Sequence, residues 1–171
     1  MSTHPFVEVE RRFLCRAEGP LLEAADARIS MLQGYLSGGR VSVRVRREGD
    51  AWRLTCKRGS GRVREEVEVP LPADAGEALL RMAGDVRVEK TRYRVGRWEV
   101  DVYGGALEGI VVAECELFSA DEPLPPAPEG LHLLREVTDH LTAHALARVS
   151  PARAHLKVRR LLEDAGGGDS A

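Results

Sequence analysis

The sequence predicts an α+β fold that is mainly β, with its strands arranged as an antiparallel sheet or barrel. About eight segments have the two-residue alternation of strands, against three or so segments with helical patterning. Most neighbouring strand segments are joined by short turns, which favours antiparallel pairing. The strands carry charges on one face and Val, Leu, Ile, Trp and Cys on the other. A closed sheet with helices outside and a charged internal channel would accommodate both faces.

The first half of the chain is predicted to contain five strands and one short helix. The first strand alternates apolar and charged residues and ends before Gly19 and Pro20. Glycine-containing turns at Ser37-Gly38-Gly39, Glu48-Gly49-Asp50 and Gly59-Ser60-Gly61 separate the strands that follow. The predicted strands are residues 6–16, 29–36, 41–47, 52–57 and 63–70, and the short helix is residues 21–27.

The second half is predicted to alternate helices with further strands. Asp74 followed by Glu77 resembles a capping box, Gly84 can end that helix, and Ser150-Pro151 is a favourable start for a last helix. The predicted elements are a helix over 72–84, strands over 86–95, 98–103 and 110–118, an extended Pro-rich loop over 123–128, and helices over 138–148 and from 150 onwards. We therefore expect one domain over residues 1–165, with strands to about 118 and C-terminal helices over about 138–165, and a disordered tail over 166–171.

Composition limits the classes of partner. The 171 residues have a formal net charge of −2, which argues against a general nucleic-acid coat and requires any basic site to be local. No apolar run is long enough to span a bilayer, and the N-terminus lacks the apolar core of a signal peptide. Cys15, Cys56 and Cys115 lack metal-ligand spacing and are interpreted as reduced thiols. We expect a cytoplasmic protein without nucleic-acid or membrane partners, and the apolar stripe of the last helix allows a homodimer.

Charged doublets are the most informative local feature. Each has one small or apolar residue between two like charges, so both charges face one side of a strand. The acidic doublets are Glu8-Val9-Glu10, Glu66-Val67-Glu68 and Glu114-Cys115-Glu116, and the basic doublets are Arg44-Val45-Arg46 and Lys90-Thr91-Arg92. Like charges paired in a sheet destabilise it, so their segregation indicates ligands that neutralise them. Carboxylates bind Mg²⁺ and arginine forks bind phosphate oxygens, which together predict a site for a metal-bound polyphosphate.

At these residues the sequence resembles the CYTH superfamily, also called triphosphate tunnel metalloenzymes. The resemblance covers residues 6 to about 140. It rests on Glu8-Val9-Glu10-Arg11-Arg12 followed by Phe13-Leu14, Gln33-Gly34-Tyr35-Leu36, Arg44-Val45-Arg46, Leu54-Thr55-Cys56-Lys57, Arg64-Glu65-Glu66-Val67-Glu68, Glu89-Lys90-Thr91-Arg92-Tyr93, Glu99-Val100-Asp101-Val102-Tyr103, Glu114-Cys115-Glu116-Leu117 and Glu136-Val137-Thr138.

The resemblance implies a closed eight-stranded antiparallel β-barrel whose tunnel binds a triphosphate, with a few outer helices and a C-terminal helix that closes one end. It implies that Mg²⁺ or Mn²⁺ is held by Glu8, Glu10, Glu114 and Glu116, with Glu66, Glu68 and Asp101 as further acidic tunnel residues. It assigns phosphate binding to Arg12, Arg44, Arg46, Lys57, Lys90 and Arg92, and activation of the attacking water to Lys90 and Tyr35.

Two positions depart from the family pattern. Arg12 replaces the lysine of the N-terminal motif, and Asp139-His140-Leu141-Thr142 stands where relatives often carry an Arg-Tyr pair. His140 and His144 have the spacing of a helical metal pair, but surface or capping roles are the favoured interpretation.

The function expected from this resemblance is metal-dependent hydrolysis of inorganic triphosphate. One alternative is the hydrolysis of thiamine or nucleoside triphosphates, or the cyclisation of ATP. Trp52 is the only residue we can name for stacking on an organic group, and packing is its favoured interpretation. A second alternative is a polyphosphate-binding module with weak or no activity, which the replacement at Arg12 keeps open.

Overall fold

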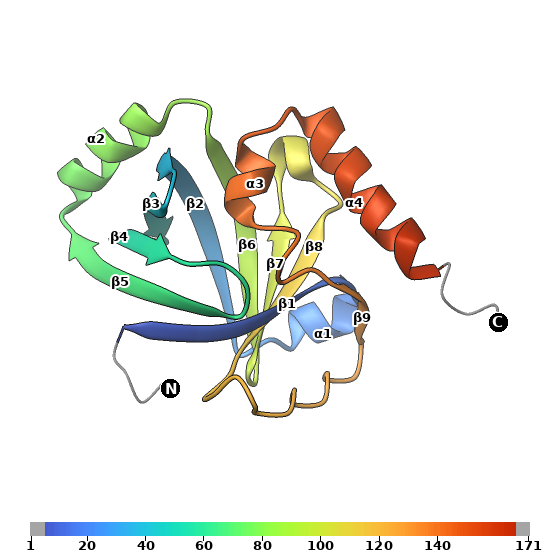
Figure 1. The fold of residues 1–171 in the computed structure, drawn as a ribbon. Helices are drawn as coiled ribbons and strands as arrows, with labels where there is room; N and C mark the ends of the chain where they lie inside the picture. Colours follow the sequence, from blue (N-terminus) through green and yellow to red (C-terminus); the bar gives the residue numbers. More distant parts are fainter. Residues whose placement is uncertain (1–5, 167–171) are drawn as a thin grey trace.

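A computed structural model describes residues 6–166 of the chain. Within that range the chain forms nine strands, four α-helices and one 3-10 helix (Figure 1). The strands are β1 (Val7–Ala17), β2 (Ala27–Gly38), β3 (Val41–Glu48), β4 (Ala51–Arg58), β5 (Val63–Leu71), β6 (Arg87–Val95), β7 (Trp98–Tyr103), β8 (Val111–Glu116) and β9 (Leu131–Glu136). The helices are α1 (Gly19–Glu23), α2 (Ala73–Ala83), η1 (Gly105–Leu107), α3 (Ala143–Ala147) and α4 (Pro151–Gly166).

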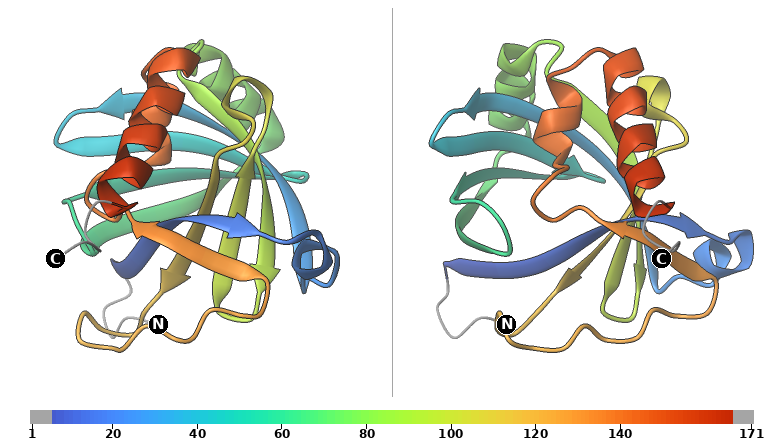
Figure 2. Two further views of the ribbon diagram at one scale, coloured as in Figure 1. Left: turned by 90° about the vertical axis from the view of Figure 1, so that its right-hand side faces the viewer. Right: turned by 45° about the vertical axis from the view of Figure 1, so that its right-hand side comes forward.

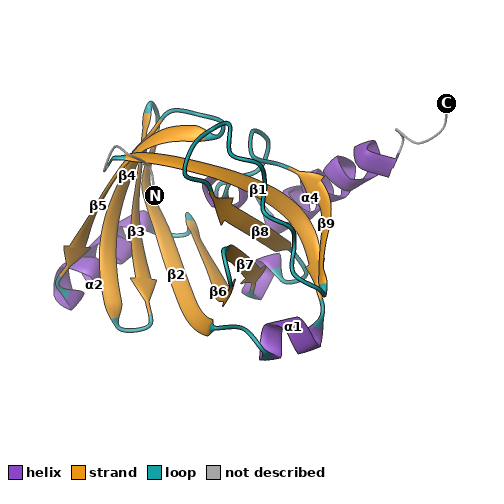
Figure 3. Cartoon of the chain, turned by 90° about the horizontal axis from the view of Figure 1, so that it is seen from below, coloured by secondary structure: helices purple, strands orange, loops and turns teal. Residues whose placement is uncertain are grey.

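Eight of these strands close into an antiparallel barrel, which confirms the predicted fold class. Their order is β5-β4-β3-β2-β6-β7-β8-β1, and β1 pairs back to β5 (Figure 3). The closing pair is short, because it joins only Val7–Val9 to residues 63–65 of β5. From Phe13 onwards the same edge of β1 pairs with the additional strand β9 instead, with a register shift between Leu14 and Cys15. The barrel is therefore closed at one end of β1 and splayed at the other.

The alternation of β1 shows how the barrel separates charges from apolar side chains. Val9, Phe13 and Cys15 belong to an apolar core on the outer side of β1, β7 and β8, beneath the loop that leads to β9. Glu10 and Arg12, on the other parity, line the interior. The expectation that both strand faces are occupied is confirmed.

Helix α2 covers the outer face of β2, β3 and β4, and glycines make the close approach possible. A Cβ on Gly34 would lie 2.7 Å from Ala83, and a Cβ on Gly76 would lie 2.3 Å from the Trp52 ring. Trp52 is consequently buried beneath α2. The predicted capping box is wrong, because the N-cap residue is Pro72 and makes no side-chain hydrogen bond.

The C-terminal region differs most from expectation. Residues 131–136, which were not predicted as a strand, form β9, and the helix predicted over 138–148 is only α3. The Thr138 hydroxyl accepts a hydrogen bond from the Arg12 amide at 3.0 Å, whereas Thr142 caps α3 by accepting from the Ala145 amide. The intervening residues therefore form a turn.

A second apolar core joins the C-terminal helices to one end of the barrel. Helix α3 contacts β2 and β6, and α4 contacts β9 and η1 (Figure 2). Val137, Leu141 and Leu146 pack there against Tyr35 and Tyr103. Residues 167–171 of the expected tail lie outside the described range. Among the helices described, none has the length and apolar character needed to cross a membrane.

Candidate active site

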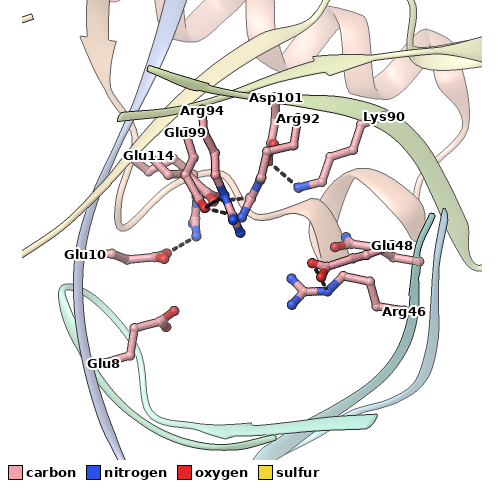
Figure 4. A network of polar contacts seen from close by, with 12 residues as sticks. Glu8, Glu10, Arg46, Glu48, Lys90, Arg92, Arg94, Glu99, Asp101 and Glu114 are labelled. Carbon is pink, nitrogen blue, oxygen red and sulfur yellow. Dashed lines mark hydrogen bonds and ion pairs between the residues drawn. The ribbon is translucent and has the colours of Figure 1, made fainter. Parts of the chain in front are cut away.

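The barrel interior is a cavity of about 680 Å³ whose walls are mostly charged. Eleven arginines and lysines and eight glutamates line it. Every site residue expected from the sequence is on this wall except Asp101, which lies fully buried beneath Lys90 and Arg92. Figure 4 shows side chains from opposite walls pointing toward one another across this space. The doublets of like charge therefore share one interior.

The deepest ion pairs centre on Asp101. Arg92 and Asp101 are paired residues of β6 and β7, and the guanidinium donates to both carboxylate oxygens at 2.7 Å. Lys90 also donates to this carboxylate. Burial lowers the pKa of Lys90, and the negative charge of Asp101 opposes that effect. Lys90 is thus an amine with little access to water, held in place by a buried carboxylate.

Glu114 is held ionised between two arginines. Arg12 donates to it at 2.8 Å from β1, and Arg92 at 2.7 Å from β6. Burial alone would raise the pKa of Glu114, but Arg12 and Arg92 outweigh burial and hold it well below its ordinary value.

Arg12, the residue that departs from the family lysine, has three partners. Besides Glu114 it donates to Glu10 and, at 3.0 Å, to the Leu141 carbonyl of the turn before α3. Despite burial, these carboxylates raise its pKa. A lysine has one ammonium group and cannot reproduce the planar fork. The replacement therefore adds a link between the barrel and the plug, which is the turn and helix α3 over residues 137–147 that pack on one end of the barrel.

The wall formed by β3, β4 and β5 holds paired and unpaired cations. Arg46 donates to Glu68 at 3.0 Å, and Thr55 donates to the same oxygen at 2.9 Å. Arg44, in contrast, has no carboxylate within 4.0 Å in residues 6–166, and its buried Nε has no hydrogen-bond partner. Arg44 is therefore available to an anionic ligand.

The N-terminal acidic doublet meets cations from β4 and β5. Glu8 accepts two hydrogen bonds from Lys57, at 2.8 and 2.9 Å, and Lys57 lies 2.5 Å from Glu66. Arg64 donates to Glu8 and to Glu10. In the absence of ligands, the carboxylates of this wall are neutralised by the protein's own cations.

Glu116 is the exception among the carboxylates proposed to bind metal. It has no ion pair in the described part of the chain, and burial together with the charge of Glu8 raises its pKa. Such a group favours an added cation, so the donor set of Glu8, Glu10, Glu114 and Glu116 fits a hard divalent ion. No group of three or more such side chains in residues 6–166 converges closely enough to form a ready-made site. Binding would require these carboxylates to exchange their present partners.

Tyr35 lies where the cavity meets the plug. Its hydroxyl accepts from Gln33 Nε2 at 3.2 Å, and burial raises its pKa, which makes it a poor base. Its ring centroid is 4.8 Å from that of His144, whose position opposite Gly38 depends on the absence of a Cβ there. His140 lies in the turn before α3, so the two histidines do not form a helical metal pair.

Several lining residues were not predicted as site residues. They are Arg40, Glu48, Arg53, Arg64, Arg94, Arg97, Glu99 and His144. Strand alternation could have identified Arg64, which precedes Glu66 by two residues, and likewise Arg94 and Glu99. The Trp52 side chain is not among the lining residues, because it lies under α2 on the outer face.

Comparison with known proteins finds named enzymes that are similar to this chain in sequence and in structure. No protein-family model matches the chain. An inorganic triphosphatase of Nitrosomonas europaea is 32% identical over 124 residues, covering 67% of this chain and 78% of the relative. One of Acetivibrio thermocellus is 34% identical over 118 residues, covering 64% and 74%. The crystal structure of the inorganic triphosphatase NE1496 superposes with a TM-score of 0.57 at 28% identity, covering 84% of this chain and 96% of that one.

Proposed function

The chain belongs to the inorganic triphosphatase family of the CYTH, or triphosphate tunnel metalloenzyme, superfamily, and on that premise we propose that it hydrolyses inorganic triphosphate inside its barrel. The observation that carries the proposal is the charged cavity of the barrel, in which basic and acidic side chains face each other. A linear polyanion would take over the arginines and lysines as partners, and the carboxylates released in this way would then need a divalent cation.

The arginines and lysines of the cavity would bind the substrate. Arg44 has no carboxylate within 4.0 Å among the described residues, so it is the first group we expect to engage a phosphate, with Arg46 beside it on β3. Arg12 on β1 and Arg92 on β6 also line the cavity, where their forks can stabilise negative charge that develops on the transferring phosphoryl group. Lys57 and Lys90 complete the set expected from the sequence.

Lys90 is our candidate for orienting the attacking water. It is buried, its pKa is lowered by that burial, and Asp101 holds its ammonium group in place. Tyr35 is better suited to forming the wall and donating a hydrogen bond, because its raised pKa disfavours the phenolate. Water would attack the terminal phosphorus in line with the leaving oxygen.

Glu8, Glu10, Glu114 and Glu116 would hold Mg²⁺ or Mn²⁺, which supplies charge neutralisation at the phosphate oxygens when bound. Glu66 and Glu68 lie on the β5 wall as additional acidic groups. The supporting observation is the raised pKa of Glu116, a carboxylate without a cationic partner among the described residues.

The alternatives from the sequence have less support. Recognition of thiamine or adenine needs an aromatic surface at the cavity, and Trp52 is buried outside it. Tyr35 is the one aromatic residue lining the cavity in residues 6–166, and His144 already packs on its ring. A pure binding module remains the second candidate, favoured only by the extra contacts of Arg12.

Phosphate release from triphosphate, measured with Mg²⁺, Mn²⁺ or chelator, tests the proposal. We expect chelator to abolish release, and Glu8→Gln and Arg44→Gln each to lower kcat/KM by about 100-fold or more. Glu65→Gln, on an exposed residue of the same strand as Glu66, is the matched control and should behave as the native protein. ATP and thiamine triphosphate should react no faster than triphosphate. Tight triphosphate binding without turnover under any divalent metal would establish the binding module instead.

A further inference from the structure

Arg64 joins the two carboxylates of the N-terminal acidic doublet through a single nitrogen atom. Its Nη2 donates to Glu8 at 2.8 Å and also to Glu10. Pairing between β1 and β5 puts Arg64 directly opposite Glu8, so the backbone itself directs the guanidinium to this place. One positive centre shared by two carboxylates is also the arrangement expected of a bridging cation.

Arg64 differs from the other cations that touch these carboxylates. Arg12 contacts Glu10 but is also held by Glu114 and the Leu141 carbonyl, and Lys57 contacts Glu8 but also Glu66. For Arg64, Glu8 and Glu10 are the only side-chain partners among residues 6–166. Only 11% of the Arg64 side chain is exposed, and its Nε is buried without a hydrogen-bond partner.

From this geometry we infer that Arg64 is an internal counter-ion, which neutralises Glu8 and Glu10 in the metal-free protein and must leave them when a divalent cation binds. The inference rests on the proposed function, since it assigns these carboxylates to the metal. Arg64 is thus a positioning residue that sets metal affinity. Its positive charge reduces the repulsion between the Glu8 and Glu10 carboxylates. It also lowers the affinity of the metal-free tunnel for a divalent cation.

The physical basis is competition for the same oxygens. A divalent cation beside Glu8 and Glu10 would face the full charge of the guanidinium at short range, where little water screens it. Binding therefore includes the cost of moving Arg64 away. A neutral side chain at this position removes that cost and leaves Glu8 with Lys57 and Glu10 with Arg12 as their remaining partners. The two carboxylates then bind metal more readily but repel each other more strongly without it.

Mn²⁺ binding without triphosphate tests the inference, with free Mn²⁺ followed by electron paramagnetic resonance. We expect Arg64→Gln to lower the Kd for Mn²⁺ at least about tenfold, equal to about 1.4 kcal/mol. Arg64→Lys keeps a cation and should stay close to the native value. Arg58→Gln removes an arginine of the adjacent strand β4 that pairs with Glu65 on the exposed side, and should change nothing.

Equal or weaker Mn²⁺ binding by Arg64→Gln would overturn the inference, because it would mean that Arg64 holds the carboxylates ready for metal. Failure of any form to bind Mn²⁺ would also overturn it. The thermal unfolding temperature supplies a second readout, since Arg64→Gln should be less stable than the native protein without metal and gain more from added Mn²⁺.

An independent measurement on the native protein covers the case in which Arg64→Gln does not fold. The Nε–H resonance of Arg64, assigned by its loss in Arg64→Lys, should shift on titration with Mg²⁺; an unchanged resonance at saturating Mg²⁺ contradicts displacement. These binding readouts are separate from turnover. If Mn²⁺ competes with Arg64 but no phosphate is released from triphosphate, the proposed function fails while the counter-ion role stands.

Discussion

The carboxylate of Asp101 lies behind the tunnel wall, beneath Lys90 and Arg92, with no exposure to solvent. It accepts two hydrogen bonds from Arg92 and one from Lys90, so one negative charge serves two buried positive charges. Burial of charged groups is tolerated only when each is paired, because desolvation costs several kcal/mol per ion. Asp101 is therefore the residue that allows both cations to face the substrate.

Asp101→Asn should destabilise the protein by about 3–5 kcal/mol, because it leaves Lys90 and Arg92 without their shared counter-charge. Equilibrium urea unfolding measures this change. Asp50→Asn, in the exposed turn between β3 and β4, is the matched control and should stay within about 0.5 kcal/mol of the native protein. Native stability in Asp101→Asn would show that water or an anion readily replaces the buried carboxylate.

Glu116 predicts a pH dependence of opposite sign to that of a paired carboxylate. Its folded-state pKa is raised by burial and by Glu8, so the folded protein binds its proton more tightly than the unfolded chain does. The ionised form thus lowers stability, and this loss develops as pH rises through the folded-state pKa.

Glu116→Gln removes that penalty, so the variant should unfold at a higher temperature than the native protein at about pH 8. The difference should vanish at about pH 4, below the ordinary value of 4.5. Thermal unfolding followed by circular dichroism across this pH range, without metal, is the measurement. A variant less stable than the native protein at about pH 8 would show that Glu116 has a stabilising partner.

Among the elements, α2 is positioned by two glycines instead of by its caps. A methyl group on Gly34 of β2 would clash with Ala83 of α2, and one on Gly76 of α2 would clash with Trp52 of β4, so either would hold the helix away from the sheet. The close contact buries Trp52 on the outer face of β4 and leaves the inner face to polar and charged residues such as Thr55 and Lys57.

Gly76→Ala tests this account, because two effects of opposite sign compete. Alanine favours a helix interior over glycine by about 1 kcal/mol, but a Cβ at this position would lie 2.3 Å from a Trp52 ring atom. Overpacking of this kind costs about 1–3 kcal/mol, so we expect a net loss of stability in thermal unfolding. Gly19→Ala, where nothing lies within 4 Å, should be neutral or stabilising. An increase in stability for Gly76→Ala would mean that α2 moves freely over Trp52.

The strands were predictable because their alternation is local, whereas the elements after residue 118 depend on distant partners. Leu131–Glu136 has no regular alternation and becomes a strand through pairing with β1. The stretch after Thr138 has helical spacing, but the Thr138 hydroxyl and the Leu141 carbonyl both bind Arg12 from β1. Local pattern cannot reveal such contacts, since more than 120 residues separate the partners.

For the whole molecule, strand alternation and the family motifs together predicted which charges face inward, but not which of them meet. Arg12 and Glu114 pair because β1 and β8 are neighbours in a specific register, which barrel closure sets. His144 reaches the cavity only because the plug returns over Gly38. The chain has a net charge of −2, yet its cavity holds more cations than carboxylates on its wall. This local excess is what makes a polyanion the expected ligand.

The same internal neutralisation predicts how the protein responds to metal removal. Most tunnel carboxylates have an arginine or lysine partner without any metal, so the barrel does not depend on an ion in the way that a zinc finger does. Chelator should abolish phosphate release from triphosphate while the protein still unfolds cooperatively. Its free energy of unfolding should fall only by the binding contribution of the metal, about 2.7 kcal/mol at a metal concentration 100 times the Kd. The unfolding temperature should fall correspondingly. Circular dichroism and phosphate release on one sample, before chelation and after Mg²⁺ is restored, measure both effects. Loss of the far-ultraviolet signal on chelation would show that the carboxylates need the metal to fold, and that the arginines between them are too weak a substitute.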